Sequence, residues 1–147
     1  MIEKYTYGPF TQSFQSTFQR ADLEILGINT FRPSYTAFIF FNDDDVNEDS
    51  WSEERETYAG QFSVFGHGDC LGDEGHCDVP DGRRRFDDRP SHPLTPAFRR
   101  VVVTAGLRRA IEHGADLTVT IIASCEGDSH EGERLLEMSG LQIVTFA

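Results

Sequence analysis

Six short apolar segments are spaced along the chain, and each is rich in β-branched or aromatic residues. In DLEILGI, Leu23 and Ile25 fall on one face, and in QFSVF, Phe62 alternates with Ser63 and Val64 with Phe65. A period of two in segments rich in β-formers predicts strands. The six predicted strands are 22–28, 35–42, 61–65, 98–104, 117–123 and 141–146.

A single short helix is predicted between the fourth and fifth of these strands. Thr104 is expected to cap its N-terminus, because a threonine hydroxyl can accept a hydrogen bond from a free amide of the first turn. Leu107, Ala110 and Ile111 follow at helical spacing, and Gly114 supplies a stop. Residues 98–123 therefore predict a strand, a helix and a strand in succession.

Residues 1–20 form a predicted N-terminal arm ahead of the first strand. Phe10, Phe14 and Phe18 recur every four residues in it, which is typical of the apolar stripe of a helix. An extended arm whose aromatic side chains pack elsewhere fits the same residues. In both cases the three phenylalanines are expected to pack against the core.

Several strands without regular strand–helix alternation predict a mainly β fold. We expect one domain over residues 1–147, an antiparallel β-sandwich or barrel of about six or more strands with one short helix and long loops. Two connections are unusually long: an acidic linker at 43–57 and a loop at 66–97. Loops beyond about 15 residues are uncommon and often functional, so the second connection is the first place to look for a site.

The charge of the chain excludes some partners. Its 25 acidic and 13 basic residues give a formal charge of −12, which disfavours nucleic acid and anionic membranes. No apolar run approaches the roughly 20 residues that a membrane-spanning helix needs. The N-terminus lacks the apolar centre of a secretory signal, so a cytoplasmic location is expected.

The long loop begins with GHGDCLGDEGHCDVP, residues 66–80, which carries four candidate metal ligands. Imidazole and thiolate suit Zn(II) or Cu(I), and the glycines allow the loop to turn tightly. Against this, the adjacent His76 and Cys77 diverge on a regular backbone. A Cys70–Cys77 disulfide, or a plain loop, explains the residues as well. A Cys–His nucleophile pair is a third alternative, but nothing marks an oxyanion hole. The candidate ligands are His67, Cys70, His76 and Cys77.

The acidic linker carries a second candidate cation site. Its run from Asp43 to Asp49 lacks the glycine and the distal glutamate of an EF-hand, so a solvated linker is expected instead. Trp51 lies within this linker. It either anchors the linker to the sheet or contacts a partner.

The order of segments resembles a known family. ADLEILGI, SYTAFIFFND, TYAGQFSVFGHG, FRRVVVTAGLRRAIEHGADLTVTIIA and LQIVTF together resemble the C-terminal β-sandwich domain of tyrosinases and polyphenol oxidases, over roughly residues 20–147. Hemocyanins of the same type 3 copper class carry a similar domain. The GHGDCLGDEGHC insertion departs from the plant form of this domain.

The resemblance implies an accessory role. In the family, a separate helical domain oxidises phenols at two coppers held by six histidines, whereas this chain has 5 histidines and lacks a helical H-x3-H pair. We therefore expect a non-catalytic domain that shields, matures or delivers copper to a partner type 3 copper oxidase. The resemblance makes Cys70 and Cys77 thiolate carriers and His67 and His76 auxiliary copper ligands. An exposed aromatic, Phe65 or Phe86, would be the substrate-mimicking placeholder. The alternative is a structural or protein-binding sandwich with a disulfide-tied loop and no metal.

Overall fold

The structure, a computed structural model, describes residues 1–68, 85–86, 96–114, 116–127 and 134–147. The described residues form seven strands and one helix. No helix among them is long and apolar enough to cross a membrane. In chain order the elements are β1 (Ile2–Phe10), β2 (Arg20–Ile28), β3 (Tyr35–Phe41), β4 (Tyr58–Val64), β5 (Ala97–Val102), α1 (Thr104–Glu112), β6 (Leu117–Ser124) and β7 (Gly140–Phe146).

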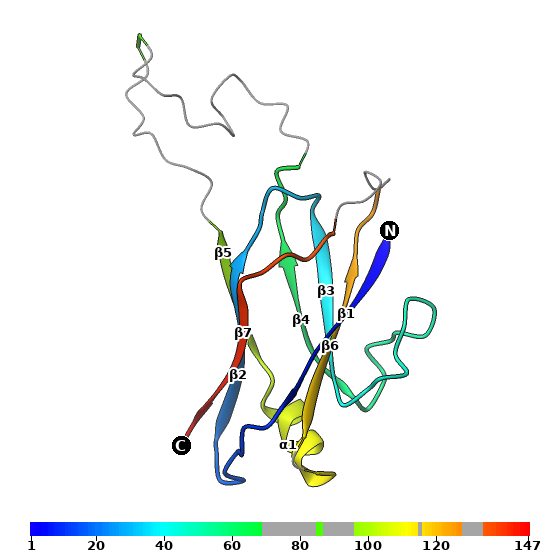
Figure 1. Cartoon of the computed structure of the whole chain (residues 1–147), viewed down its shortest axis with the longest axis vertical. Helices are drawn as coiled ribbons and strands as arrows, with labels where there is room; N and C mark the ends of the chain where they lie inside the picture. The colour runs from blue at the N-terminus through cyan, green and yellow to red at the C-terminus, as the bar shows by residue number, and fades with distance from the viewer. Residues whose placement is uncertain (69–84, 87–95, 115, 128–133) are drawn as a thin grey trace.

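The strands form two antiparallel sheets packed as a sandwich (Figure 1). The four-stranded sheet has the order β1-β6-β3-β4, and the three-stranded sheet has the order β5-β2-β7. The predicted mainly β sandwich is thus confirmed, and each of the six predicted strands is present within a few residues of its expected limits.

The main core lies between the sheets. Period-two alternation turns Leu23 and Ile25 of β2 toward Ile39 of β3 and Ile121 of β6, and all four side chains are fully buried. Phe62 and Val64 of β4 face the same core, as their alternation predicted. Burial of this apolar area is the main force that holds the sheets together.

The N-terminal residues are a strand rather than a helix. Residues 2–10 of the expected arm form β1, which pairs with β6 from Ile2↔Ser124 to Phe10↔Leu117. Residues 11–19, which carry Phe14 and Phe18, form no helix, so the helical alternative is wrong. The extended arm is correct, and its first part is held by pairing with a strand more than 100 residues away. Phe10, Phe14 and Phe18 do pack against the core, as expected.

Helix α1 is present, but its expected cap is wrong. The helix begins at Thr104 without a side-chain cap. The hydroxyl of Thr104 instead accepts a hydrogen bond from the amide of Ala21 in β2, at 3.0 Å. That bond ties the start of the helix to the three-stranded sheet. At the other end, Gly114 follows the last turn with a positive φ, consistent with the predicted stop.

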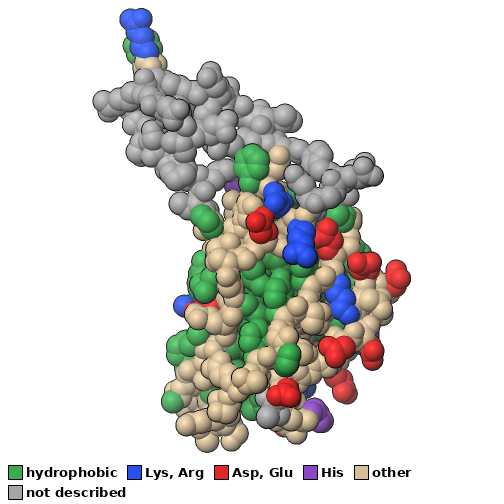
Figure 2. Space-filling model, viewed as in Figure 1, with side chains coloured by type: hydrophobic (Ala, Val, Ile, Leu, Met, Phe, Trp, Pro, Cys, Tyr) green, Lys and Arg blue, Asp and Glu red, His purple; other side chains and the backbone are tan. Residues whose placement is uncertain are grey.

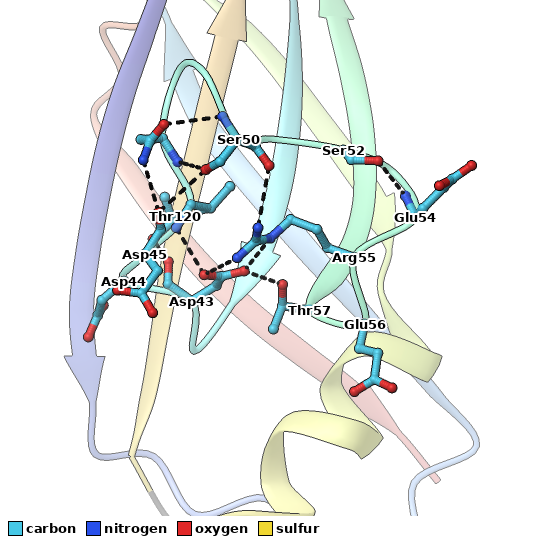
Figure 3. A network of polar contacts seen from close by, with 12 residues as sticks. Asp43, Asp44, Asp45, Ser50, Ser52, Glu54, Arg55, Glu56, Thr57 and Thr120 are labelled. Atoms are coloured by element: carbon cyan, nitrogen blue, oxygen red, sulfur yellow. Dashed lines mark hydrogen bonds and ion pairs between the residues drawn. The ribbon is translucent and has the colours of Figure 1, made fainter.

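The acidic connection from β3 to β4 is folded against the outer face of the four-stranded sheet, not fully solvated as expected. Val46 is completely buried there, in a second apolar cluster with Phe38, Phe40 and Ile122. The carboxylate of Asp43 is also buried and forms the centre of a polar network with Arg55, shown in Figure 3. The density of acidic residues predicted a solvated linker. Instead, Val46 and Trp51 pack on the sheet and Arg55 pairs with Asp43, so the segment is held against the fold.

Candidate functional site

The described start of the 66–97 loop is fastened to one end of the sandwich. The amide of Gly66 donates to the Ser34 hydroxyl at 3.0 Å. The amides of His67 and Gly68 donate to the carbonyl oxygens of Thr30 and Arg32, at 2.8 and 3.1 Å. Three consecutive amides therefore hold the loop entrance against the 29–34 connection between β2 and β3. The position of His67 is thus set by backbone hydrogen bonds, while Cys70, His76 and Cys77 lie outside the described residues.

Close backbone contact explains the glycine at position 66. A β-carbon there would lie 1.9 Å from the carbonyl oxygen of Arg32 and 2.4 Å from the carbonyl carbon of Pro33. Backbone atoms cannot move aside as the end of a flexible side chain can. Gly66 is therefore required for the loop entrance to reach the 29–34 connection.

Replacing Gly66 with alanine is expected to lower the free energy of unfolding by about 1–3 kcal/mol, because the added methyl group displaces the Arg32 backbone. Urea unfolding monitored by circular dichroism measures this loss. Ser63→Ala is the control, because its exposed hydroxyl is bonded only to that of Thr36 among the described residues. A Gly66→Ala protein as stable as this control would contradict the close contact.

The imidazole of His67 lies beside an exposed aromatic ring. Its ring centroid is 5.4 Å from that of Phe65, in an edge-on arrangement. Among the described residues, the His67 Nδ1 atom is buried and has no hydrogen-bond partner. Phe65 is 75% exposed. This end of the sandwich therefore carries one imidazole nitrogen without a hydrogen-bond partner among the described residues, next to an apolar ring that faces solvent.

An ion pair that sequence analysis missed supports the loop entrance. The Arg32 guanidinium donates to the Glu137 carboxylate at 2.8 Å, and the Asn29 amide donates to the same oxygen at 2.9 Å. These contacts join the 29–34 connection to the segment before β7. Arg32 and Glu137 are 105 residues apart, so no local pattern could have paired them.

The other two aromatic candidates have different surroundings. Phe86 is 93% exposed, and the Arg85 guanidinium lies 5.1 Å from its ring centroid. Trp51 stacks on Phe38 of β3 with centroids 4.2 Å apart, so it anchors the acidic connection to the sheet. Partner contact by Trp51, Phe65 and Phe86 stays a prediction.

An open groove of about 790 Å³ lies on the outer face of the four-stranded sheet. Its aromatic part is the Trp51–Phe38 stack together with Phe65, and hydroxyl groups from Thr36 and Ser63 line it as well. The groove therefore connects the anchored acidic segment to the exposed ring next to His67. It offers a mixed apolar and polar surface rather than a set of reactive groups.

The described residues do not form a metal centre by themselves. No group of three or more histidine, cysteine or acidic side chains able to hold a metal occurs in this part of the chain. Of the four predicted ligands only His67 is described, and one nitrogen does not make a copper site. A metal held here would need ligands from the loop beyond Gly68.

Comparison with known proteins identifies solved structures with a similar fold. No protein-family model and no curated protein matches this sequence. Among solved structures, latent aurone synthase (polyphenol oxidase) from natural source matches with a TM-score of 0.51 and 13% identity, over 99% of this chain and 24% of that chain. Recombinantly expressed latent aurone synthase matches with a TM-score of 0.49 and 14% identity, with the same coverage. The chain thus spans about a quarter of the length of these proteins. Its fold is that of a sandwich domain of a latent polyphenol oxidase, as the resemblance predicted.

Proposed function

We propose that this chain is a non-catalytic, tyrosinase-type sandwich domain that shields a partner type 3 copper oxidase and delivers copper to it. The observation that carries this proposal is the fold, which matches latent aurone synthase over 99% of the chain. The chain's 5 histidines are one fewer than the six that hold the coppers in the family it resembles. The partner would therefore supply the oxidation chemistry.

The shielding part of the proposal draws on the end of the sandwich that carries the 66–97 loop. Phe65 directly precedes residues 66–68, whose amides are held by three hydrogen bonds, so its exposed ring is presented to solvent at a defined place. A positioned, exposed aromatic ring is suited to fill a partner's phenol-binding cavity, since burial of an aromatic anchor contributes strongly to an interface. Phe86 is the second candidate for the same role.

The copper part of the proposal draws on the ligand types. His67 is held with Nδ1 free of hydrogen bonds to the described residues, and Cys70 follows it after two residues. Thiolate and imidazole ligands favour Cu(I), which they could bind and release to a higher-affinity site. The residues that would hold it are His67, Cys70, His76 and Cys77.

The reduced chain is expected to bind about one equivalent of Cu(I) in competition with a colorimetric Cu(I) chelator. The double variant Cys70→Ser, Cys77→Ser is expected to lose this binding, with an affinity at least about tenfold lower, because serine is a poor ligand for Cu(I). The matched control is Cys125→Ser, which changes the third cysteine, a buried residue directly after β6. Undiminished binding by the double variant would contradict the copper role and leave the shielding role to be judged separately.

A second candidate function is a structural or protein-binding sandwich whose loop is closed by a Cys70–Cys77 disulfide. It is favoured by the backbone hydrogen bonds of residues 66–68, which fix the loop entrance to the 29–34 connection. Counting thiols in unfolded, unreduced protein separates the two functions. One free thiol per chain, that of Cys125, supports the disulfide, and three support the copper role.

A further inference from the structure

Strand β7 is an edge of the three-stranded sheet. It pairs with β2 over seven consecutive residue pairs, from Arg20↔Phe146 to Leu26↔Gly140, without a register shift. Among the described residues it has no strand partner on its other side. One row of its backbone amides and carbonyl groups is therefore available to another strand.

The other three edge strands are each interrupted or covered. Strand β1 carries Lys4, Pro9 and a register shift, and its Glu3 and Tyr5 side chains accept hydrogen bonds from the backbone of the 134–136 segment. Strand β5 carries two adjacent arginines and a register shift against β2. Strand β4 has a register shift against β3 and packs against α1 and β5. Shifts, prolines and charges of this kind prevent pairing between sheet edges.

Strand β7 has none of these features. Its sequence, GLQIVTF, contains no charged residue and no proline, and its regular pairing with β2 keeps it straight enough to accept a second neighbour. Uncharged strands rich in β-formers pair readily when an edge is open. Among the strands that the structure describes, β7 is therefore the edge best suited to pair with another strand.

The distribution of charge favours a second copy of the chain as the neighbour. The 43–57 segment carries eight acidic side chains and one arginine, so it accounts for −7 of the total −12. It packs on the outer face of the four-stranded sheet. In Figure 2, most acidic side chains of the visible face lie on the side where Figure 1 places this segment, away from β7. Next to β7, Asp22 pairs with Arg20 at 2.7 Å and Glu24 with Arg100 at 2.8 Å. Two copies can therefore meet along β7 with their acidic segments far apart.

We propose that two copies of the chain associate through their β7 strands, in antiparallel pairing about a two-fold axis. The register that pairs all seven residues places Ile143 opposite the partner's Ile143 and Val144 opposite the partner's Gln142. It brings no like charges together and extends the three-stranded sheet to six strands. This association stands independently of the proposed copper and shielding roles.

Two valines make a matched test of this edge. Val144 on β7 and Val102 on β5 both lie beside Asp22 on the outer face of the same sheet. Lysine at either position adds the same charge beside the same carboxylate, but only Val144→Lys places it on the pairing edge. Sedimentation equilibrium from about 1 to 200 μM is expected to show a dimer that Val144→Lys weakens at least about tenfold and Val102→Lys changes by less than about twofold.

Three results would overturn the proposal. A wild-type chain that is monomeric throughout this concentration range excludes the dimer. If β7 of that monomer binds an extended segment of another protein, the occupant of the edge is that protein and not a second copy. If Val144→Lys and Val102→Lys weaken the dimer equally, the two copies contact each other through the outer face of the sheet and not through the β7 edge. If Val144→Lys does not fold, hydrogen exchange of the wild type decides, because pairing slows exchange of residues 140–146 as concentration rises. Exchange there that does not change with concentration excludes the dimer.

Discussion

Replacing Phe40 with alanine is expected to lower the free energy of unfolding by about 3–5 kcal/mol, the usual range for a fully buried phenylalanine. Phe40 is completely buried on the outer side of the four-stranded sheet, where the 42–57 connection covers it. Its ring packs against Tyr58 with centroids 5.8 Å apart. The substitution leaves a cavity between the sheet and the connection, and urea unfolding measures its cost.

Phe65→Ala is the matched control, because it removes the same side chain from a position that is 75% exposed. The expected loss is below about 1 kcal/mol, since little apolar area is buried there. Equal losses from the two variants would show that the 42–57 connection does not cover Phe40. If the Phe65→Ala protein is stable, the same variant can be used to test whether Phe65 contacts a partner.

Replacing Asp43 with alanine is expected to lower the free energy of unfolding by about 2–3 kcal/mol, because it leaves Arg55 and a buried amide without their acceptor. The Asp43 carboxylate accepts hydrogen bonds from Arg55 at 2.8 and 3.0 Å, from the Val46 amide at 2.9 Å and from the Thr57 hydroxyl (Figure 3). The value lies below that of a fully buried ion pair because Arg55 is partly exposed. Chemical unfolding at neutral pH measures it.

The same network makes the stability of the folded protein depend on pH. Burial would raise the pKa of Asp43, but hydrogen bonds from Arg55, Thr57 and the Val46 amide outweigh burial and hold the pKa below its ordinary value. The carboxylate therefore contributes its full stabilisation above the ordinary pKa of about 4, and this is lost as the pH falls through the lowered folded-state pKa.

Asp43→Asn isolates this effect, because asparagine keeps the shape but does not titrate. The stability difference between wild type and Asp43→Asn is expected to be constant from about pH 7 to 5 and to shrink below about pH 4. Asp44→Asn is the control, since Asp44 is exposed and lies next to the network without accepting its bonds. A difference that stays constant down to pH 2 would show that the pKa of Asp43 is not lowered.

The chemistry of the candidate site stays a prediction from residue types, and its surroundings could not be predicted. His67 was chosen because imidazole and thiolate together form a soft ligand set, and Phe65 because the resemblance implies an exposed aromatic placeholder. That Gly66, His67 and Gly68 are fixed to the 29–34 connection was not predictable, since backbone hydrogen bonds leave no trace in side-chain type. The pairing of Arg32 with Glu137 was missed for a similar reason, because many arginines and acids could have paired.

The fold was predictable where a segment's own pattern decided it. Leu23 and Ile25 in β2, or Phe62 and Val64 in β4, alternate with a period of two, and this local property already specifies a strand with one buried face. Strand β1 lacks such a dense pattern, so its conformation depends on pairing with β6 at the far end of the chain.

The sequence by itself thus determined six of the seven strands of the described residues, their single helix, the mainly β class and the acidic character of the protein. Only the tertiary structure decided that Thr104 bonds Ala21, that Asp43 is buried with Arg55, and that β7 is the one regular, uncharged edge among the described strands. The physical reason is the separation along the chain between the residues that interact. Hydrophobic periodicity acts between near neighbours, whereas a polar group's partner and an edge strand's exposure depend on segments brought together by folding.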